Sequence, residues 1–317
     1  MLKKEGVLDL PKQPLAEVFG FPVDNNSPDA KRHRRSQLCP FHNKVPNCTK
    51  SSVTNPLGIC SIFHGDGIAI TCPVRLRQSW LIADQAAAFF FPNHNRWTTL
   101  VEVKLKDKHG RPAGNIDIVI VAYDEAGKIF DFGSLEVQTV YISGKSVREG
   151  YFNPFMKNPV AYLRTDWSKS RRRPPHPDYL SSSRKRLVPQ LISKGGILKA
   201  WGRKQAVAVH SAFFATLPEL PEVPQKRADI AWLIYDLVHD EAQHRYNLTH
   251  TRTVYTEFKP SLDKITLFEA GPMDGFLANL QNKLDAKMEG ASDAEIADAS
   301  PDTPVDDTDL EEELENL

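Results

Sequence analysis

The chain has 317 residues, of which 41% are hydrophobic and 25% are charged, so it can form one large or two modest soluble domains with a buried core. The longest apolar run, residues 86–91, is far too short to cross a bilayer, and the sequence therefore predicts no membrane span. The N-terminus reaches Asp9 and Pro11 before an apolar segment can form, so we expect no signal peptide and a cytoplasmic protein.

The formal net charge of zero is unevenly distributed along the chain. Residues 291–317 hold eleven Asp and Glu side chains and no Lys or Arg, which leaves 40 basic and 29 acidic residues in the rest. A basic body favours a polyanionic partner such as DNA, because each Lys or Arg near a phosphate releases counterions. The alternative is a slightly basic enzyme with a solubilising tail. In either case the composition of 291–317 predicts a disordered acidic tail.

The first chemical signal along the chain is a group of four cysteines within 34 residues, after a polar linker at 22–37. They lie among Pro, Gly and Asn, a composition typical of loops held by a crosslink. Disulfides are unusual in the cytoplasm, so the group predicts a closed, structural thiolate site for one zinc or iron ion. No CxxC pair is present, and buried structural thiols are the alternative. The cysteines are Cys39, Cys48, Cys60 and Cys72.

Three strands are expected after Trp97. Apolar and charged residues alternate over 100–106, which indicates a half-buried strand. Residues 116–121 form a second, mostly apolar strand, and 129–142 form a third that Gly133 interrupts.

The remaining chain predicts further helices and strands. An Arg/Ser/Pro-rich connection covers 164–186, and helical periodicity occurs in places over 187–215. We expect a buried strand at 230–237, a strand pair at 251–268 and an amphipathic helix at 273–289. Strands followed by helices favour an α+β or mixed α/β fold, and we predict an α/β protein with a mixed central sheet flanked by helices.

Three parts of the chain follow from these patterns. Residues 1–95 form an N-terminal region with the cysteine site at 39–72, and residues 96–290 form a core with the basic segment 164–186. Residues 291–317 form the acidic tail.

A set of acidic residues on neighbouring strands suggests a metal site. Glu136 and Gln138 are two residues apart, so both project from one face of a strand. A turn near Ala126 would bring Asp117, the lone carboxylate in an apolar run, beside residues 135–136. Two facing carboxylates repel unless a cation lies between them, and Mg²⁺ prefers oxygen ligands, to which the Val137 carbonyl would add.

An acid followed on the next strand by an acid-x-polar triplet is the pattern of metal-dependent nucleases of the PD-(D/E)xK group, in which the metal activates water. Gln138 stands where most of these enzymes carry lysine. Glu102 is a further candidate carboxylate, with a solvated strand face shared with Lys104 and Lys106 as the alternative. Buried acids without catalytic function are the alternative for the whole set.

The order of these features resembles the NotI family of restriction endonucleases. The matching stretches are Cys39-Pro40-Phe41, Gly58-Ile59-Cys60, Cys72-Pro73, Leu135-Glu136-Val137-Gln138-Thr139 and Gly144, within residues 15–240. The resemblance implies iron or zinc at the four cysteines and an active site of Asp117, Glu136 and Gln138. It also implies a homodimer that cuts a palindromic, GC-rich site in double-stranded DNA. The connection between the two catalytic strands departs from the family pattern, and the acidic tail has no counterpart there.

Two basic clusters fit a DNA-cutting enzyme, because arginine both neutralises phosphates and reads guanine in the major groove. They are Arg171-Arg172-Arg173 and Arg184-Lys185-Arg186, and a flexible solvated loop is the alternative. A non-catalytic DNA-binding regulator and a repair or mobile-element nuclease are the rival functions, and a likeness of fold alone does not decide among them.

Overall fold

The computed structural model describes residues 12–42, 46–93, 96–144, 147–170, 174–267 and 270–290. These residues fall into two compact units that divide after Ile265. The predicted tail at 291–317 and the cluster Arg171-Arg172-Arg173 lie outside the described residues. Among the residues that are described, no helix is both long enough and apolar enough to cross a membrane.

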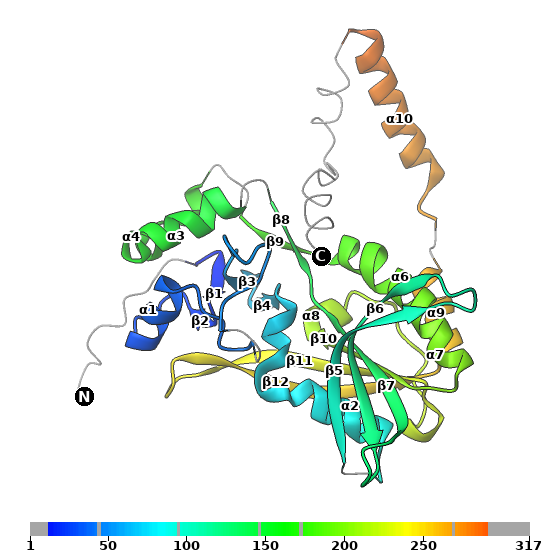
Figure 1. The fold of residues 1–317 in the computed structure, drawn as a ribbon. Coiled ribbons are helices and arrows are strands. Elements are labelled where there is room, and N and C mark those ends of the chain that lie inside the picture. The colour runs from blue at the N-terminus through cyan, green and yellow to red at the C-terminus, as the bar shows by residue number, and fades with distance from the viewer. Residues whose placement is uncertain are drawn as a thin grey trace, which may run out of the picture. The chain divides into compact units, whose positions relative to one another are not determined.

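A six-stranded mixed sheet forms the centre of the first unit (Figure 1). Strand β10 runs parallel to both of its neighbours, β7 and β11, and the other neighbouring pairs are antiparallel. The predicted α/β class with a large mixed sheet flanked by helices is therefore confirmed. In spatial order the strands are β12 (Arg245–Thr256), β11 (Ile230–Asp240), β10 (Gln205–His210), β7 (Ile129–Gln138), β6 (Pro112–Tyr123) and β5 (Trp97–Lys106).

Helix α2 (Leu81–Phe90) covers one face of this sheet. Its buried alanines and phenylalanines pack against Leu135 and Val137 of β7 and against the small residues of β10. Gly133 belongs to this contact, because a Cβ there would lie 2.5 Å from the ring of Phe90. The glycine that interrupts the apolar pattern of β7 thus allows the helix to approach the strand closely.

A helical run at 179–200 lies against the other face of the sheet. Leu187 and Leu191 from this run share a core with Val207 and Val209 of β10. Side chains alternate between the two faces of a strand, so β10 contributes to both layers and is entirely buried. The run comprises α5 (Tyr179–Ser181), η4 (Ser182–Leu187), α6 (Val188–Gln190), η5 (Leu191–Gly195) and α7 (Gly196–Ala200), with π-helical turns at η4 and η5.

A four-stranded antiparallel sheet organises the N-terminal region, in the order β2 (Phe21–Pro22), β1 (Leu15–Val18), β3 (Ile59–His64), β4 (Gly67–Ile70). Helix α1 (Pro28–Arg35) starts at Ser27, whose hydroxyl accepts the Ala30 N–H, with Pro28 in the first turn. A 3₁₀ segment, η1 (Pro73–Trp80), leads from this sheet to α2.

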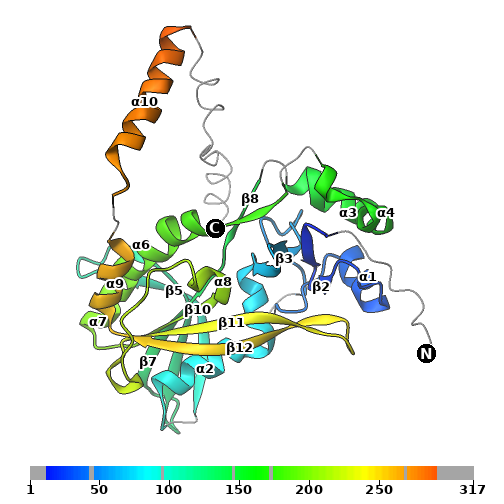
Figure 2. The same cartoon turned by 180° about the vertical axis from the view of Figure 1, so that it is seen from behind.

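The long β11–β12 hairpin joins the two sheets (Figure 2). Asn25 donates its side-chain N–H to the carbonyl of His244 at the hairpin end, at 2.6 Å. Arg75 donates to the carbonyl of Tyr246 at 2.8 Å. The N-terminal region therefore holds the end of a hairpin that begins in the central sheet.

The remaining elements of the first unit connect these layers. They are β8 (Tyr141–Ser143), η2 (Arg148–Phe152), α3 (Asn153–Lys157), α4 (Pro159–Arg164), η3 (Trp167–Lys169), β9 (His176–Asp178), α8 (Ser211–Phe214), η6 (Gln225–Arg227) and α9 (Phe258–Thr266).

Several predicted elements were wrong in detail. The expected third strand, 129–142, ends at Gln138, and β8 then pairs with β9 in a separate sheet. Part of the expected helical region 187–215 is β10, whose short apolar run resembles a buried helix segment. The expected strand pair at 251–268 is the end of β12 followed by α9, and the expected connection at 164–186 contains helical turns.

The predicted helix at 273–289 is present as α10 (Met273–Met288) in the second unit. None of its side chains is buried within the described structure. Its large apolar side chains are therefore exposed, namely Met273, Phe276, Leu277, Leu280, Leu284 and Met288.

Candidate active site

The two acidic residues predicted to form a site lie together where β6 and β7 separate. The antiparallel register of these strands ends at the pair Ile118 and Leu135, and the next residues along are Asp117 and Glu136. The Asp117 Oδ2 atom then accepts the backbone N–H of Val137 at 2.9 Å. The Asp117 side chain thus takes the place of a backbone hydrogen-bond acceptor at this point. The two carboxylates, of Asp117 and Glu136, therefore lie next to each other.

Glu136 is almost completely buried, with 1% of its surface exposed. Its Oε2 atom accepts from Lys194 Nζ at 2.8 Å, whereas Oε1 is buried and has no hydrogen-bond partner. Burial raises the pKa of Glu136 to about 7; repulsion from Asp117 adds to this rise, and Lys194 opposes it. In the deprotonated pair one Glu136 oxygen is therefore left without a donor, and a hydrogen bond from protonated Glu136 to the Asp117 side chain adds to the rise in pKa.

Lys194 was not identified from the sequence. It lies in the π-helical turn η5, which covers the face of the sheet from which Glu136 projects, and is 5% exposed. Its sequence signal is its position between Leu191 and Leu198, which are both buried, at the spacing of one helix face. A lysine on an otherwise apolar helix face needs a buried partner, and this signal would have marked it.

Gln138 and Glu102 lie near this pair in different surroundings. Gln138 is buried, and its Nε2 atom donates to the carbonyl of Thr139 at 2.7 Å. Glu102 is exposed on β5 between Val101 and Val103, whose partners on β6 are Ile118 and Ile116. Its register position therefore faces Asp117, and its φ of +55° marks a local irregularity of the strand.

A second polar cluster lies at the carboxyl end of β10, where its parallel pairing with β11 ends. The His210 Nε2 atom is 3.3 Å from Asp236 Oδ1, and the Ser211 hydroxyl donates to the same oxygen. Burial lowers the pKa of His210, and the Asp236 charge opposes this shift. His210 directly follows Val209, the register partner of Gln138, so this cluster adjoins the acidic site. This cluster was not predicted from the sequence, because the strand Gln205–His210 was not expected.

The four cysteines lie in one neighbourhood, presented by two antiparallel pairings. Cys39 and Cys48 follow Leu38 and Asn47, which form a β-bridge. Cys60 begins the β3–β4 pairing, and its carbonyl accepts the N–H of Thr71, the residue before Cys72. Cys60 is therefore carried by a strand, whereas Cys39, Cys48 and Cys72 lie outside the strands, in loops as expected.

All four cysteines are free thiols, and three are buried. Burial raises the pKa of Cys39, Cys48 and Cys60, and charge on neighbouring thiols adds to each rise. Within the described ranges, no group of three or more His, Cys, Asp or Glu side chains is arranged to hold a metal ion. The structure thus gathers the four thiols without showing the predicted metal site.

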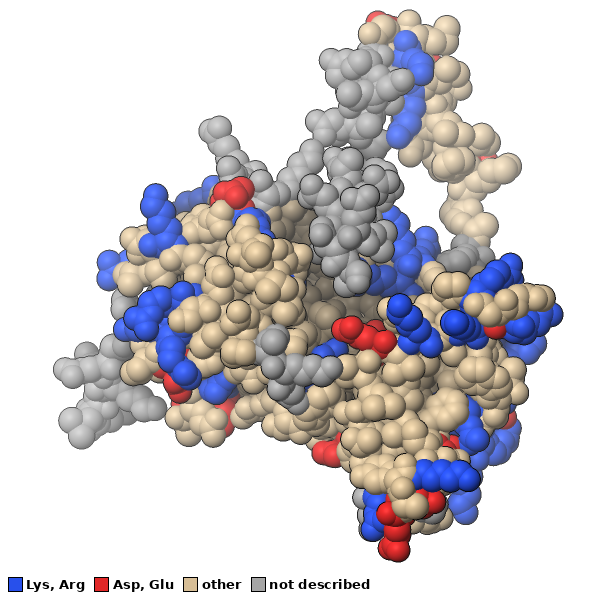
Figure 3. Space-filling view, in the orientation of Figure 1, with Lys and Arg blue, Asp and Glu red and all other residues tan. Residues whose placement is uncertain are grey.

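Basic side chains gather over α1, α3 and α4 and over the α6–α7 run with the β5–β6 loop (Figure 3). Of the predicted basic residues, Arg184, Lys185 and Arg186 lie on η4, and the guanidinium of Arg186 is 3.8 Å from the centre of the Tyr141 ring. Arg34 on α1 is buried and donates to two backbone carbonyls, so it serves the fold.

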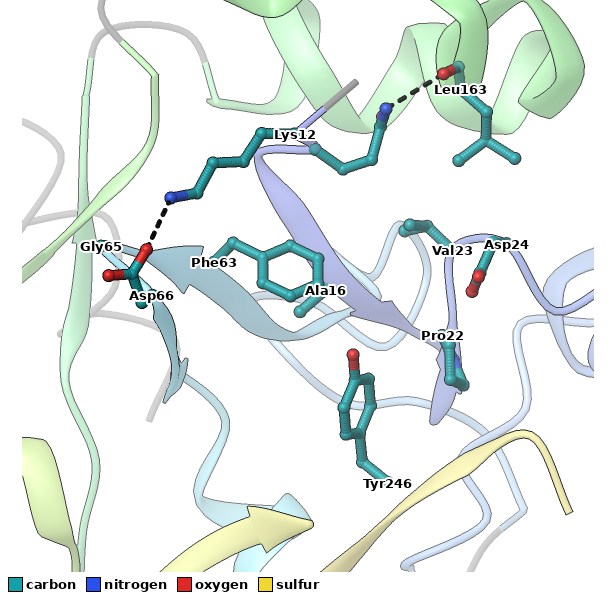
Figure 4. Close-up of a pocket in the computed structure, with 11 residues that line it drawn as sticks. Lys12, Ala16, Pro22, Val23, Asp24, Phe63, Gly65, Asp66, Leu163 and Tyr246 are labelled. Atoms are coloured by element: carbon teal, nitrogen blue, oxygen red, sulfur yellow. Dashed lines mark hydrogen bonds and ion pairs between the residues drawn. The ribbon is translucent and has the colours of Figure 1, made fainter. Parts of the chain in front are cut away.

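A pocket of about 380 Å³ lies away from Asp117 and Glu136, in the N-terminal region (Figure 4). Tyr246 points into it between apolar walls that include Phe63 and Val23, and Lys12 pairs with Asp66 at its rim, at 3.4 Å. None of the predicted site residues lines it.

A mixed sheet flanked by helices, with a buried glutamate and a half-buried aspartate adjacent on its central strands, is the architecture of an α/β enzyme. The profile of the family described as "Restriction endonuclease NotI" matches residues 17–248, most of the chain. The protein therefore belongs to the NotI restriction endonuclease family, whose activity is that of a DNA-cleaving hydrolase. The comparison with curated proteins found no match to the chain.

Proposed function

We propose that the protein is a type II restriction endonuclease that hydrolyses phosphodiester bonds in double-stranded DNA at a specific site, with Mg²⁺ at Asp117 and Glu136. The observation that supports this most is the unpartnered, buried Oε1 atom of Glu136 beside Asp117, within the region that the family profile matches. We further propose that the site belongs to the PD-(D/E)xK group, with Gln138 in the place of lysine.

The residues present suit a hard divalent cation. Carboxylate oxygens are the ligands that Mg²⁺ prefers, and a cation shared by the buried Glu136 and the half-buried Asp117 removes their mutual repulsion. The Val137 N–H orients Asp117 by holding one of its oxygens. The Val137 carbonyl and the Glu102 carboxylate are the proposed further ligands.

When bound, Mg²⁺ lowers the pKa of a coordinated water and stabilises negative charge on the phosphate. The negative charges of the Asp117 and Glu136 carboxylates would bind the cation. Gln138 is proposed to orient water through its amide, since the two-residue period of β7 puts it on the same face of the strand as Glu136. It carries no charge of its own.

We also propose how the rest of the molecule contributes. Cys39, Cys48, Cys60 and Cys72 would bind one structural iron or zinc ion, for which four thiols are a suitable soft donor set. The basic residues Arg184, Lys185 and Arg186, together with Arg171, Arg172 and Arg173, would contact DNA phosphates. A homodimer would cut both strands of a palindromic, GC-rich site.

The test is Mg²⁺-dependent cleavage of unmethylated, GC-rich duplex DNA, followed by sequencing of the ends. We expect one defined cut site, with cleavage abolished by EDTA and by Glu136→Gln. The matched control is Glu125→Gln on the exposed turn of the same β6–β7 hairpin, where Glu125 is 3.7 Å from Arg96. This control should cleave like the wild type.

Each other outcome favours a rival function. Specific DNA binding without cleavage in Mg²⁺ would identify a non-catalytic regulator. Structure-selective nicking without a defined sequence would identify a repair or mobile-element nuclease. Full activity of Glu136→Gln would remove the proposed active site.

A further inference from the structure

Lys194 and Glu136 form a buried ion pair that the proposed mechanism does not yet use. Their closest atoms, Nζ and Oε2, are 2.8 Å apart, and both side chains are almost fully shielded from water. A buried ion pair contributes little stability compared with apolar residues of the same volume, because both charges lose their hydration. Buried charged groups of this kind gather at functional sites.

The backbone around Lys194 allows this lysine to approach the sheet. Its turn, η5, is π-helical, a rare geometry that is found frequently at functional sites. A Cβ at Gly195 would lie 2.7 Å from the Phe258 ring and 2.9 Å from Gln205 Oε1. A Cβ at Gly114, whose φ is +108°, would lie 3.3 Å from Lys194 Cε. Gly195 thus lets the turn pack against Phe258 and Gln205, and Gly114 leaves room for the lysine side chain.

Gln138 does not supply positive charge at this site. Its amide is neutral and donates to the carbonyl of Thr139. Phosphodiester cleavage develops negative charge on the phosphate, and a fixed positive charge in a water-poor site stabilises it. Among the described residues, the cation that the structure pairs with Glu136 is Lys194.

We propose that Lys194 is a positioning residue of the cleavage site, which holds Glu136 through Oε2, leaves Oε1 for the metal ion shared with Asp117, and supplies the positive charge that Gln138 lacks. This inference rests on the proposed nuclease function and adds a residue to it. The charge comes from a helix that covers the sheet, and not from the strand that carries the acids.

The test compares single-turnover cleavage by the full-length protein in Mg²⁺. Lys194→Met keeps most of the length of the side chain and removes its charge, and should slow cleavage on the order of 100-fold. Lys194→Arg keeps the charge and should recover part of the rate. The control is Lys199→Met one turn further along, where the exposed Lys199 pairs with Asp229. It should cleave like the wild type.

Relocating the lysine separates a role in cleavage from a role in folding. Gln138→Lys in the Lys194→Met background restores a positive charge beside the acids from the strand. We expect the double variant to cleave at least about tenfold faster than Lys194→Met alone, which corresponds to about 1.4 kcal/mol. If Lys194 were needed only for packing, a lysine at position 138 would not restore the cleavage rate.

A second measurement is independent of cleavage. Without divalent cations, Lys194→Met should melt at a lower temperature than the wild type, because Glu136 is left buried without a counter-charge. Glu136→Gln in the same background should restore the melting temperature. Mg²⁺ should then raise the melting temperature of Lys194→Met more than that of the wild type, because the cation replaces the missing counter-charge.

The outcomes distinguish this inference from the proposed function. If the wild type cleaves no DNA, both fail. If the wild type cleaves and Lys194→Met cleaves equally fast, only the role of Lys194 is overturned. No rescue by Gln138→Lys, together with Lys194→Arg as slow as Lys194→Met, would assign Lys194 to the fold alone. Lys194→Gln, which keeps a hydrogen-bond donor, replaces Lys194→Met with the same expectations where the latter does not fold.

Discussion

The carboxylate of Asp117 accepts the backbone N–H of Val137 at 2.9 Å, and so takes the place of a backbone carbonyl where β6 and β7 separate. The same side chain is half of the proposed Mg²⁺ site. Asp117 thus joins the local fold to the proposed chemistry, and two substitutions can separate these contributions.

Asp117→Asn keeps an oxygen that can accept the Val137 N–H but loses the negative charge. We expect its melting temperature to stay close to that of the wild type while cleavage falls on the order of 100-fold or more. Asp117→Ala should lose activity and also about 1–3 kcal/mol of unfolding free energy, because the Val137 N–H loses its partner. Urea unfolding and single-turnover cleavage are the measurements. An active Asp117→Asn protein would contradict the proposed site.

Removing the buried Arg75–Glu17 ion pair should destabilise the N-terminal region. Arg75 Nε donates to both oxygens of Glu17, at 2.9 and 3.1 Å, and neither side chain is exposed. Arg75→Met leaves Glu17 buried and uncompensated, which should cost about 3–5 kcal/mol of unfolding free energy in urea.

Two further variants control for this effect. Arg111→Ala breaks the exposed pair with Asp107 and should change stability little, because solvent screens such pairs. Glu17→Gln combined with Arg75→Met should be more stable than Arg75→Met alone. If Arg75→Met were as stable as Arg111→Ala, the pair would not hold the region together.

His210 should make the stability of the protein fall in mild acid. Burial lowers its pKa below the ordinary value of 6.5, so the folded state binds a proton less readily than the unfolded chain. Its contribution is complete above about pH 6.5 and is lost as the pH falls from there towards the folded pKa, by at most about 1.4 kcal/mol per pH unit.

The measurement for this effect is urea unfolding from pH 5 to pH 8, compared with His210→Gln. Glu136, whose pKa is raised, contributes with the opposite sign, so only the difference between the two proteins isolates His210. We expect this difference to change with pH below 6.5 and to be constant above it. A difference that is constant over the whole range would contradict the role of His210.

The cysteine region should carry metal if the proposal for it is right. Four thiolates form one tetrahedral site, so elemental analysis should find about one iron or zinc per chain. Cys60→Ser should reduce this content and lower the melting temperature, because metal binding free energy also stabilises the fold. A metal-free, fully folded protein, or a disulfide map that pairs the four cysteines, would remove the metal site.

The local pattern of the sequence determined which residues form the acidic site. A single carboxylate in an apolar run and an acid two residues before Gln138 were visible as departures from strand periodicity. The hairpin between them is short, so chain geometry alone brought Asp117 to Glu136. The four cysteines stood out equally, because few residues separate them. Family membership followed from these motifs, and the family profile confirms it.

Only the tertiary structure decided what lies opposite these residues. Lys194 is 58 residues from Glu136 and reaches it from a helix, and β10 enters the centre of the sheet by a parallel crossover. Local periodicity does not encode such contacts, because they depend on which layer packs on which strand face. By its apolar pattern alone, the short run Gln205–His210 cannot be distinguished from a buried helix segment. It is a strand because its two parallel neighbours, β7 and β11, satisfy its backbone hydrogen bonds. Sequence spacing thus identified Asp117 and Glu136. The packing of layers that are distant in the sequence placed Lys194 and His210 beside them.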